Sequence, residues 1–159
     1  MKYAIDTSVL VASLVTTDKL HGRAKVFMNK IQAGEIEYGC VSRITLAEMG
    51  YILERLTHDA EYAHNSIYSF SQYLNLEILD VTWDFITTLA HLKAINPISF
   101  CDNATLAAAQ LTNAIALFTK EKAIVTRNKS KLTGPEIVFL EDLERLLDHV
   151  NGTKSDTLE

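Results

Sequence analysis

The chain has 159 residues, of which 48% are hydrophobic and 22% charged, and its formal net charge is −5. A chain of this length and composition folds as one globular domain that buries about two thirds of its unfolded surface. The negative charge excludes a protein that coats nucleic acid through a broad basic face, although it permits local contact through metal ions.

Apolar segments in this sequence are short. The N-terminal stretch MKYAIDTSVLVASLV is interrupted by Asp6, and no apolar run approaches the ~18 residues that a membrane span needs. Cys40 and Cys101 are the two cysteines of the chain, and they lack zinc-like spacing. A chain with two cysteines is consistent with a reducing compartment. We therefore expect a soluble, cytoplasmic protein with core thiols, no signal peptide and no membrane contact.

Apolar residues recur along the chain with the periods of strands and helices in turn. The expected strands are 2–5, 35–41, 77–81, 115–119 and 136–140. The expected helices are 7–16, 21–34, 43–56, 60–74, 82–95, 99–112 and 141–150. This alternation predicts an α/β fold with three layers, in which helices cover both faces of a mainly parallel sheet. We expect one domain over 1–150 and a flexible polar tail over 151–159.

Several helix ends are marked by residues with specific backbone preferences. Ser42 is a good N-cap for the helix that follows it. Asn96-Pro97 ends another helix, because the residue before proline disfavours helical geometry. Asn113 adopts the left-handed conformation easily, so we expect the helix from Asp102 to end there and a strand to begin directly after it.

Three acidic residues lie where the site of an α/β protein is usually built. Asp6 follows the first strand, Glu48 lies in an apolar helix after the second, and Asp102 begins the helix before the fourth. Each also has a structural explanation. Asp6 can cap the helix at Thr7, Asp102 has capping-box spacing from Ser99, and Glu48 can face water or pair with a nearby arginine.

Considered together, the three carboxylates favour a functional explanation. Two carboxylates ~4 Å apart repel by about 4 kcal/mol at an effective dielectric constant of ~20, so they need a cation or a proton between them. All-oxygen ligands select Mg²⁺ or Mn²⁺. Such an ion activates water for attack on a phosphodiester, so the pattern indicates metal-assisted hydrolysis.

The ordered motifs resemble the PIN-domain ribonucleases, most of all the VapC-type toxins of prokaryotic toxin–antitoxin pairs. The resemblance covers about residues 2–148. It is carried by YAIDTSVLVA with Asp6, SRITLAEM with Glu48, SFCDNATLAAAQ with Asp102, and a later strand that ends in threonine followed by an acid.

This resemblance implies a parallel sheet of about five strands and a cluster of four acids that holds Mg²⁺ or Mn²⁺. The implied activity is cleavage of single-stranded or structured RNA by metal-activated water. Asp6, Glu48 and Asp102 would bind the metal or the water, and Thr7 and Ser8 would form hydrogen bonds within the site. VapC-type proteins usually form dimers and are silenced by a small antitoxin, so a homodimer and a cognate antitoxin are implied.

The fourth acid departs from the family pattern of Thr-x-Asp. The two candidate segments are Thr119-Lys120-Glu121 and Thr126-Arg127-Asn128. Because Asn113 closes the preceding helix and connections are usually short, the first segment is the expected strand end. We therefore assign Thr119 and Glu121 to the site, with Glu121 as the fourth catalytic and metal-binding acid. Asn128 is expected in a loop nearby, where it touches substrate.

Two other classes of protein remain as alternatives. A receiver-type signalling domain also binds Mg²⁺ at the edge of a parallel sheet, but it needs adjacent acids after the first strand, and Asp6 has no acidic neighbour. A non-catalytic PIN-like protein that binds metal or RNA is the closer alternative, because Glu121 and Asn128 are consistent with a weakened site.

Overall fold

The computed structural model describes residues 1–143, which form a five-stranded parallel sheet in the order β3-β2-β1-β4-β5. The strands are β1 (Lys2–Ile5), β2 (Tyr38–Ser42), β3 (Leu76–Leu79), β4 (Ile115–Phe118) and β5 (Ile137–Phe139). In the central strand, Ala4 lies between Cys40 of β2 and Ala116 of β4. The expected mainly parallel sheet is confirmed.

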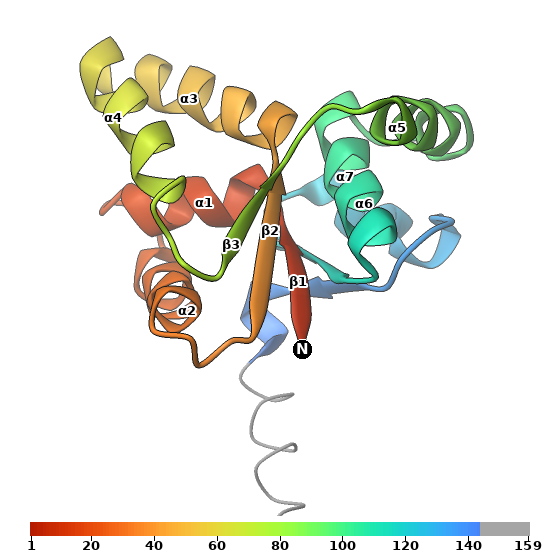
Figure 1. The fold of residues 1–159 in the computed structure, drawn as a ribbon, viewed down its shortest axis with the longest axis horizontal. Coiled ribbons are helices and arrows are strands. Elements are labelled where there is room, and N and C mark those ends of the chain that lie inside the picture. The colour runs from red at the N-terminus through yellow and green to blue at the C-terminus, as the bar shows by residue number, and fades with distance from the viewer. Residues whose placement is uncertain (144–159) are drawn as a thin grey trace, which may run out of the picture.

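Helices cover both faces of this sheet, which gives three layers (Figure 1). One side carries α1 (Thr7–Leu14), α2 (His21–Gln32), α3 (Arg43–Thr57) and α4 (Ala60–Phe70). The other carries α5 (Trp83–Ile95), α6 (Phe100–Thr112) and α7 (Ala123–Asn128). Two short 3-10 turns, η1 (Lys129–Lys131) and η2 (Leu140–Asp142), flank β5.

Successive residues of β1 point into two separate apolar cores. Tyr3 and Ile5 belong to the core beneath α1 to α4, and Ala4 belongs to the core beneath α5 and α6. This alternation follows from the two-residue period of a strand. Both faces of the central strand are therefore buried, as expected for a parallel sheet.

Small side chains bring α6 close to the sheet. Ala104, Ala107 and Ala108 are buried in the same core as Ala4 and Ala116. Because alanine keeps the separation between helix and sheet short, the first turn of α6 lies near the carboxyl ends of the central strands. Asp102 is in that first turn.

The expected helix ends are confirmed. The Ser42 side chain accepts a hydrogen bond from the Thr45 backbone N–H at 3.0 Å and caps α3. Helix α5 ends at Ile95, just before Asn96-Pro97. Asn113 has a φ of 52°, in the left-handed region, and closes α6 before β4.

The structure differs from the sequence expectation between β4 and β5. This segment contains α7 and η1, where we expected a loop. Val125 is fully buried in the core beneath α5 and α6, so a tertiary contact stabilises this short helix. Of the expected helix over 141–150, residues 141 and 142 lie in η2, and the part from 144 onward lies outside the described residues. The expected domain boundary at 150 and the expected tail also lie outside them. None of the helices in the described part is long and apolar enough to cross a membrane.

Candidate active site

The candidate site lies where β1 and β4 end side by side. Asp6 directly follows β1, and its backbone N–H donates to the Leu117 carbonyl oxygen of β4 at 2.9 Å. Thr119 directly follows β4, and its N–H donates to Ser8 Oγ at 3.2 Å. Ser8 and Thr119, which were expected in the site from two separate sequence motifs, are therefore joined by a direct hydrogen bond.

Asp6 is fully buried, and both of its carboxylate oxygens accept hydrogen bonds. Oδ2 accepts from the Ser8 N–H at 2.8 Å and from Ser8 Oγ at 2.7 Å, and Oδ1 accepts from Thr105 Oγ1 at 3.1 Å. Burial raises the pKa of the Asp6 carboxyl, and the nearby Lys122 charge and the Ser8 hydrogen bonds oppose this rise only in part. Asp6 is thus the N-cap of α1, and hydrogen bonds fix the position of its carboxylate at the edge of the sheet.

Asp102 also combines a structural contact with a site contact. It forms a capping box with Ser99, whose Oγ accepts from the Asp102 N–H at 3.0 Å while Asp102 Oδ2 accepts from the Ser99 N–H at 3.3 Å. The other oxygen, Oδ1, lies 2.9 Å from Lys122 Nζ. The structural explanation for this acid therefore holds without excluding a functional one.

Lys122 connects two of the expected acids. Its ammonium lies 2.9 Å from Asp102 Oδ1 and 3.8 Å from Asp6 Oδ2. Burial alone lowers the pKa of Lys122, but the negative charges of Asp6 and Asp102 more than offset this effect, and the pKa is raised. The two carboxylates therefore share one positive charge.

Glu48 reaches the same region from α3. Its Oε2 accepts a hydrogen bond from Thr7 Oγ1 at 2.5 Å, and Thr7 Oγ1 also contacts the Thr45 carbonyl oxygen at 3.3 Å. The Cys101 thiol, at the start of α6, lies within reach of the Glu48 carboxylate. Burial and the Glu48 charge raise the pKa of Cys101 to about 11. Glu48 thus lies between α1 and the residue that precedes Asp102.

The structure places Glu121 and Asn128 differently from the other expected site residues. The Glu121 carboxylate is exposed and pairs with Lys19, with 2.8 Å between Oε1 and Nζ. Asn128 is the last residue of α7, where its side-chain amide donates to the Ile124 carbonyl oxygen at 2.8 Å. The expectation that Asn128 lies in a loop is therefore wrong, because α7 continues through it.

Sequence reasoning missed three residues that lie against Asp6, Glu48 or Asp102. Lys122 directly follows Glu121 in the sequence, Cys101 directly precedes Asp102, and Thr105 lies one helical turn after it. The helical spacing of Thr105 was a usable signal. The thiol contact of Cys101 was not, because it depends on how α3 and α6 pack.

One polar atom near the site has no partner. Thr119 Oγ1 is buried, and it is the one buried side-chain nitrogen or oxygen within residues 1–143 that lacks a hydrogen bond. Its backbone N–H contacts Ser8, which also binds Asp6. An unpaired buried hydroxyl is costly, so this atom fits a site that binds a further group.

The donor chemistry of the site fits a hard cation. Asp6 and Asp102 provide carboxylate oxygens and already share the ammonium of Lys122. Oxygen ligands favour Mg²⁺ or Mn²⁺. As the side chains stand, no three His, Cys, Asp or Glu residues within the described range are placed to hold a metal ion together.

A family model described as PIN domain matches residues 3–129. The chain belongs to the PIN-domain family. This match includes Asp6, Glu48, Asp102 and Glu121, and PIN-domain nucleases generally use divalent metal ions. Family membership therefore supports nuclease activity in general.

Solved structures of VapC toxins share the PIN fold of this chain. Mycobacterium tuberculosis VapC20, a sarcin-ricin loop cleaving toxin, is 20% identical with a TM-score of 0.63, over 77% of this chain and 93% of that one. DNA-bound VapBC from Salmonella typhimurium is 17% identical with a TM-score of 0.65, over 88% of this chain and 98% of that one. VapBC2 from Rickettsia felis, bound to a promoter DNA fragment, is 17% identical with a TM-score of 0.62, over 87% and 98%. No curated protein sequence matches the chain.

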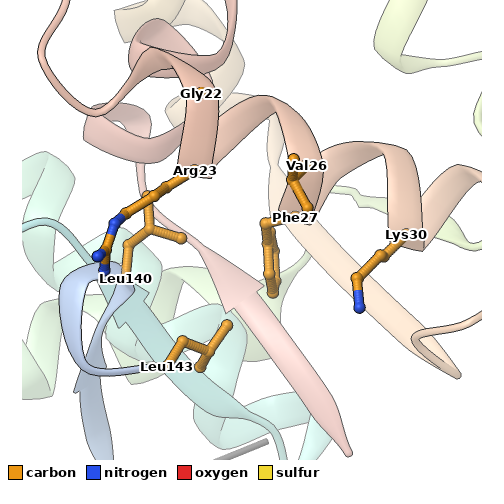
Figure 2. A pocket seen from close by; sticks show the side chains of 7 residues that line it. All are labelled: Gly22, Arg23, Val26, Phe27, Lys30, Leu140 and Leu143. Carbon is orange, nitrogen blue, oxygen red and sulfur yellow. The ribbon is translucent and has the colours of Figure 1, made fainter. Parts of the chain in front are cut away.

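A separate apolar pocket of about 350 Å³ lies between α2 and η2 (Figure 2). Its lining residues are Gly22, Arg23, Val26, Phe27, Lys30, Leu140 and Leu143. The acids expected in the active site do not line it. The pocket is therefore separate from the candidate active site.

Proposed function

We propose that this PIN domain is a Mg²⁺- or Mn²⁺-dependent endoribonuclease that cleaves single-stranded or structured RNA. The observation that carries the proposal is the convergence of Asp6, Glu48 and Asp102 at the carboxyl edge of the sheet, in a chain that belongs to a nuclease family. The negative charges of all three acids raise the pKa of Lys122. Such a concentration of negative charge is typical of a cation site.

Asp6 and Asp102 are the residues that would hold the ion, since their oxygens already face one shared positive charge. When bound, Mg²⁺ or Mn²⁺ supplies activation of water and stabilises negative charge on the phosphodiester. Ser8 and Thr105 orient the Asp6 oxygens through hydrogen bonds.

Glu48 is the proposed proton acceptor. Thr7 holds its Oε2, and the carboxylate accepts a proton from the water that attacks phosphorus. Thr119 lies beside Ser8, and its unpaired hydroxyl is available to the substrate or to water. Glu121 acts as a fourth ligand in this proposal, and it must first leave Lys19. Asn128, the last residue of α7, is assigned a substrate contact.

The structural neighbours give the proposal its biological setting. Several of them are VapBC toxin–antitoxin complexes, and one is a sarcin-ricin loop cleaving toxin. On this basis the chain is proposed to act in the cytoplasm as a toxin that forms a homodimer and is silenced by a cognate antitoxin. RNA is its proposed substrate.

The test is cleavage of a mixed single-stranded RNA pool by the metal-stripped protein, with and without added Mn²⁺ or Mg²⁺. We expect the wild type to cleave only with the ion present, and Asp6→Asn to remain inactive at every ion concentration. Cleavage by both proteins in excess chelator would contradict the proposal, and so would intact RNA with both proteins after long incubation.

A non-catalytic PIN-like protein that binds metal or RNA is the second candidate. The pairing of Glu121 with Lys19 and the presence of Lys122 between two acids favour it, because both reduce the number of free carboxylates. Retention of labelled RNA by the wild type without cleavage, in the presence of Mn²⁺, would support this candidate over the nuclease.

A further inference from the structure

We propose that Lys122 is a built-in counter-ion of the acidic site, and that a divalent metal ion binds by displacing its ammonium group from between Asp6 and Asp102. This inference rests on the proposed metal dependence of the site. It makes metal binding an exchange of one cation for another, so Lys122 sets the metal concentration at which the site becomes loaded.

The contacts of Lys122 place its ammonium where a metal ion would bind. Nζ lies 2.9 Å from Asp102 Oδ1 and 3.8 Å from Asp6 Oδ2. Asp6 is fully buried and Asp102 is 3% exposed, so neither carboxylate depends on bulk water for its charge compensation. Two close cations repel strongly in such surroundings. Lys122 and a divalent ion therefore cannot share these oxygens.

The local backbone fixes the base of the Lys122 side chain but not its end. The Lys122 N–H donates to the Thr119 carbonyl oxygen at 3.1 Å, which anchors the turn between β4 and α7. The side chain remains 25% exposed. Lysine has a flexible four-carbon stem, so the ammonium can leave toward solvent without movement of the turn.

Lys120 provides a matched control within the same turn. Its ammonium pairs with Asp142 at 2.6 Å, and it lies on the exposed side of the turn. Lys120→Met and Lys122→Met change the net charge equally and differ by two positions in the sequence. Only Lys122→Met removes the cation that contacts Asp6 and Asp102.

The first experiment measures the Mn²⁺ dissociation constant of the metal-stripped full chain by calorimetric titration. We expect Lys122→Met to lower this constant about tenfold, which corresponds to about 1.4 kcal/mol. Lys120→Met should stay within about twofold of the wild type, and Lys122→Arg, which keeps the charge, should bind no more tightly than the wild type. Equal or weaker Mn²⁺ binding by Lys122→Met would overturn the inference, as would absence of Mn²⁺ binding in every variant.

The second experiment follows urea unfolding in chelator and needs no metal-loaded protein. Lys122→Met should unfold at lower urea than the wild type, because two close carboxylates lose their counter-charge. Adding Asp102→Asn to Lys122→Met should recover part of this loss, and no recovery would overturn the counter-ion role. RNA cleavage separates this inference from the proposed function: tighter Mn²⁺ binding by Lys122→Met, with no cleavage by any variant, would support the inference and contradict the nuclease.

Discussion

Glu121 forms an ion pair with Lys19, in which 2.8 Å separates Oε1 from Nζ. The acid that follows β4 is thus drawn toward the segment between α1 and α2. The lysine that follows it, Lys122, lies between Asp6 and Asp102. A four-acid site requires Glu121 to face Asp6 and Asp102. In this structure Lys122 faces them instead, and Glu121 turns away toward Lys19.

Glu121→Gln tests whether this acid joins the site when RNA and metal are bound. If Glu121 leaves Lys19 to become the fourth ligand, the substitution should lower kcat/KM about ten- to a hundredfold, as loss of a metal-orienting group typically does. Asn128→Ala should cause a much smaller loss, because its amide is used within α7. A larger loss for Asn128→Ala would contradict the assignment of Glu121.

Asp6→Asn should stabilise the metal-free protein increasingly as pH rises above the ordinary carboxyl pKa. Because burial raises the pKa of Asp6 in the folded state, the folded protein holds this proton more tightly than the unfolded chain. The stability of the wild type therefore falls as pH rises from the ordinary carboxyl pKa through the raised one. Asparagine removes this loss and still caps α1.

Urea unfolding in chelator at several pH values measures this effect. The advantage of Asp6→Asn should be absent in acid and should grow as pH rises through the raised pKa of Asp6. Asp84→Asn, an exposed residue in the first turn of α5, is the control for the charge change. An Asp6→Asn protein that is less stable than the wild type at pH 8 would show that the paired charge of Asp6 stabilises the fold.

Thr7→Val should release Glu48 from its fixed position. The substitution keeps the shape of the side chain but removes the hydroxyl that donates to Glu48 Oε2 at 2.5 Å. A hydrogen bond to a charged group contributes roughly 1.5–3 kcal/mol, so we expect a stability loss of that order. We also expect kcat to fall about tenfold with little change in KM, because Thr7 positions the proposed base. Thr7→Ser should restore both values, and no recovery would mean that methyl packing explains the loss.

Glu48→Gln should make the Cys101 thiol more reactive. The Glu48 charge and hydrogen bond help raise the pKa of Cys101 to about 11, so little thiolate is present at pH 8. Removing the charge lowers this pKa, and iodoacetamide labelling of Cys101 should accelerate several-fold. Cys40 is an internal control, because burial, the largest cause, raises its pKa to about 11. Equal acceleration at both cysteines would indicate general loosening of the fold.

Much of the fold was predictable because local signals agreed with the tertiary structure. Ser42 begins its helix and Asn113 ends its helix for reasons that involve only neighbouring residues, and the structure confirms both. The alternating pattern also predicted a parallel sheet and the edge where Asp6 lies. Helix α7 was not predictable in this way, since it has only six residues and depends on burial of Val125.

The site was predictable in its acids but not in their partners. Asp6 and Asp102 could be placed because each immediately follows or begins a regular element. The directions of Glu121 and Lys122 depend on the turn between β4 and α7, and on contacts with residues about 20 or more positions away. Sequence spacing does not specify which of two adjacent side chains turns inward.

The most direct test of the central claim measures RNA cleavage and Mn²⁺ binding on the same metal-stripped protein. The cleavage rate should rise with Mn²⁺ and saturate at the concentration that fills the site, and Asp6→Asn and Asp102→Asn should remove both the activity and the binding. Cleavage that persists in chelator, or that survives both substitutions, would contradict a metal-dependent nuclease built on these two carboxylates.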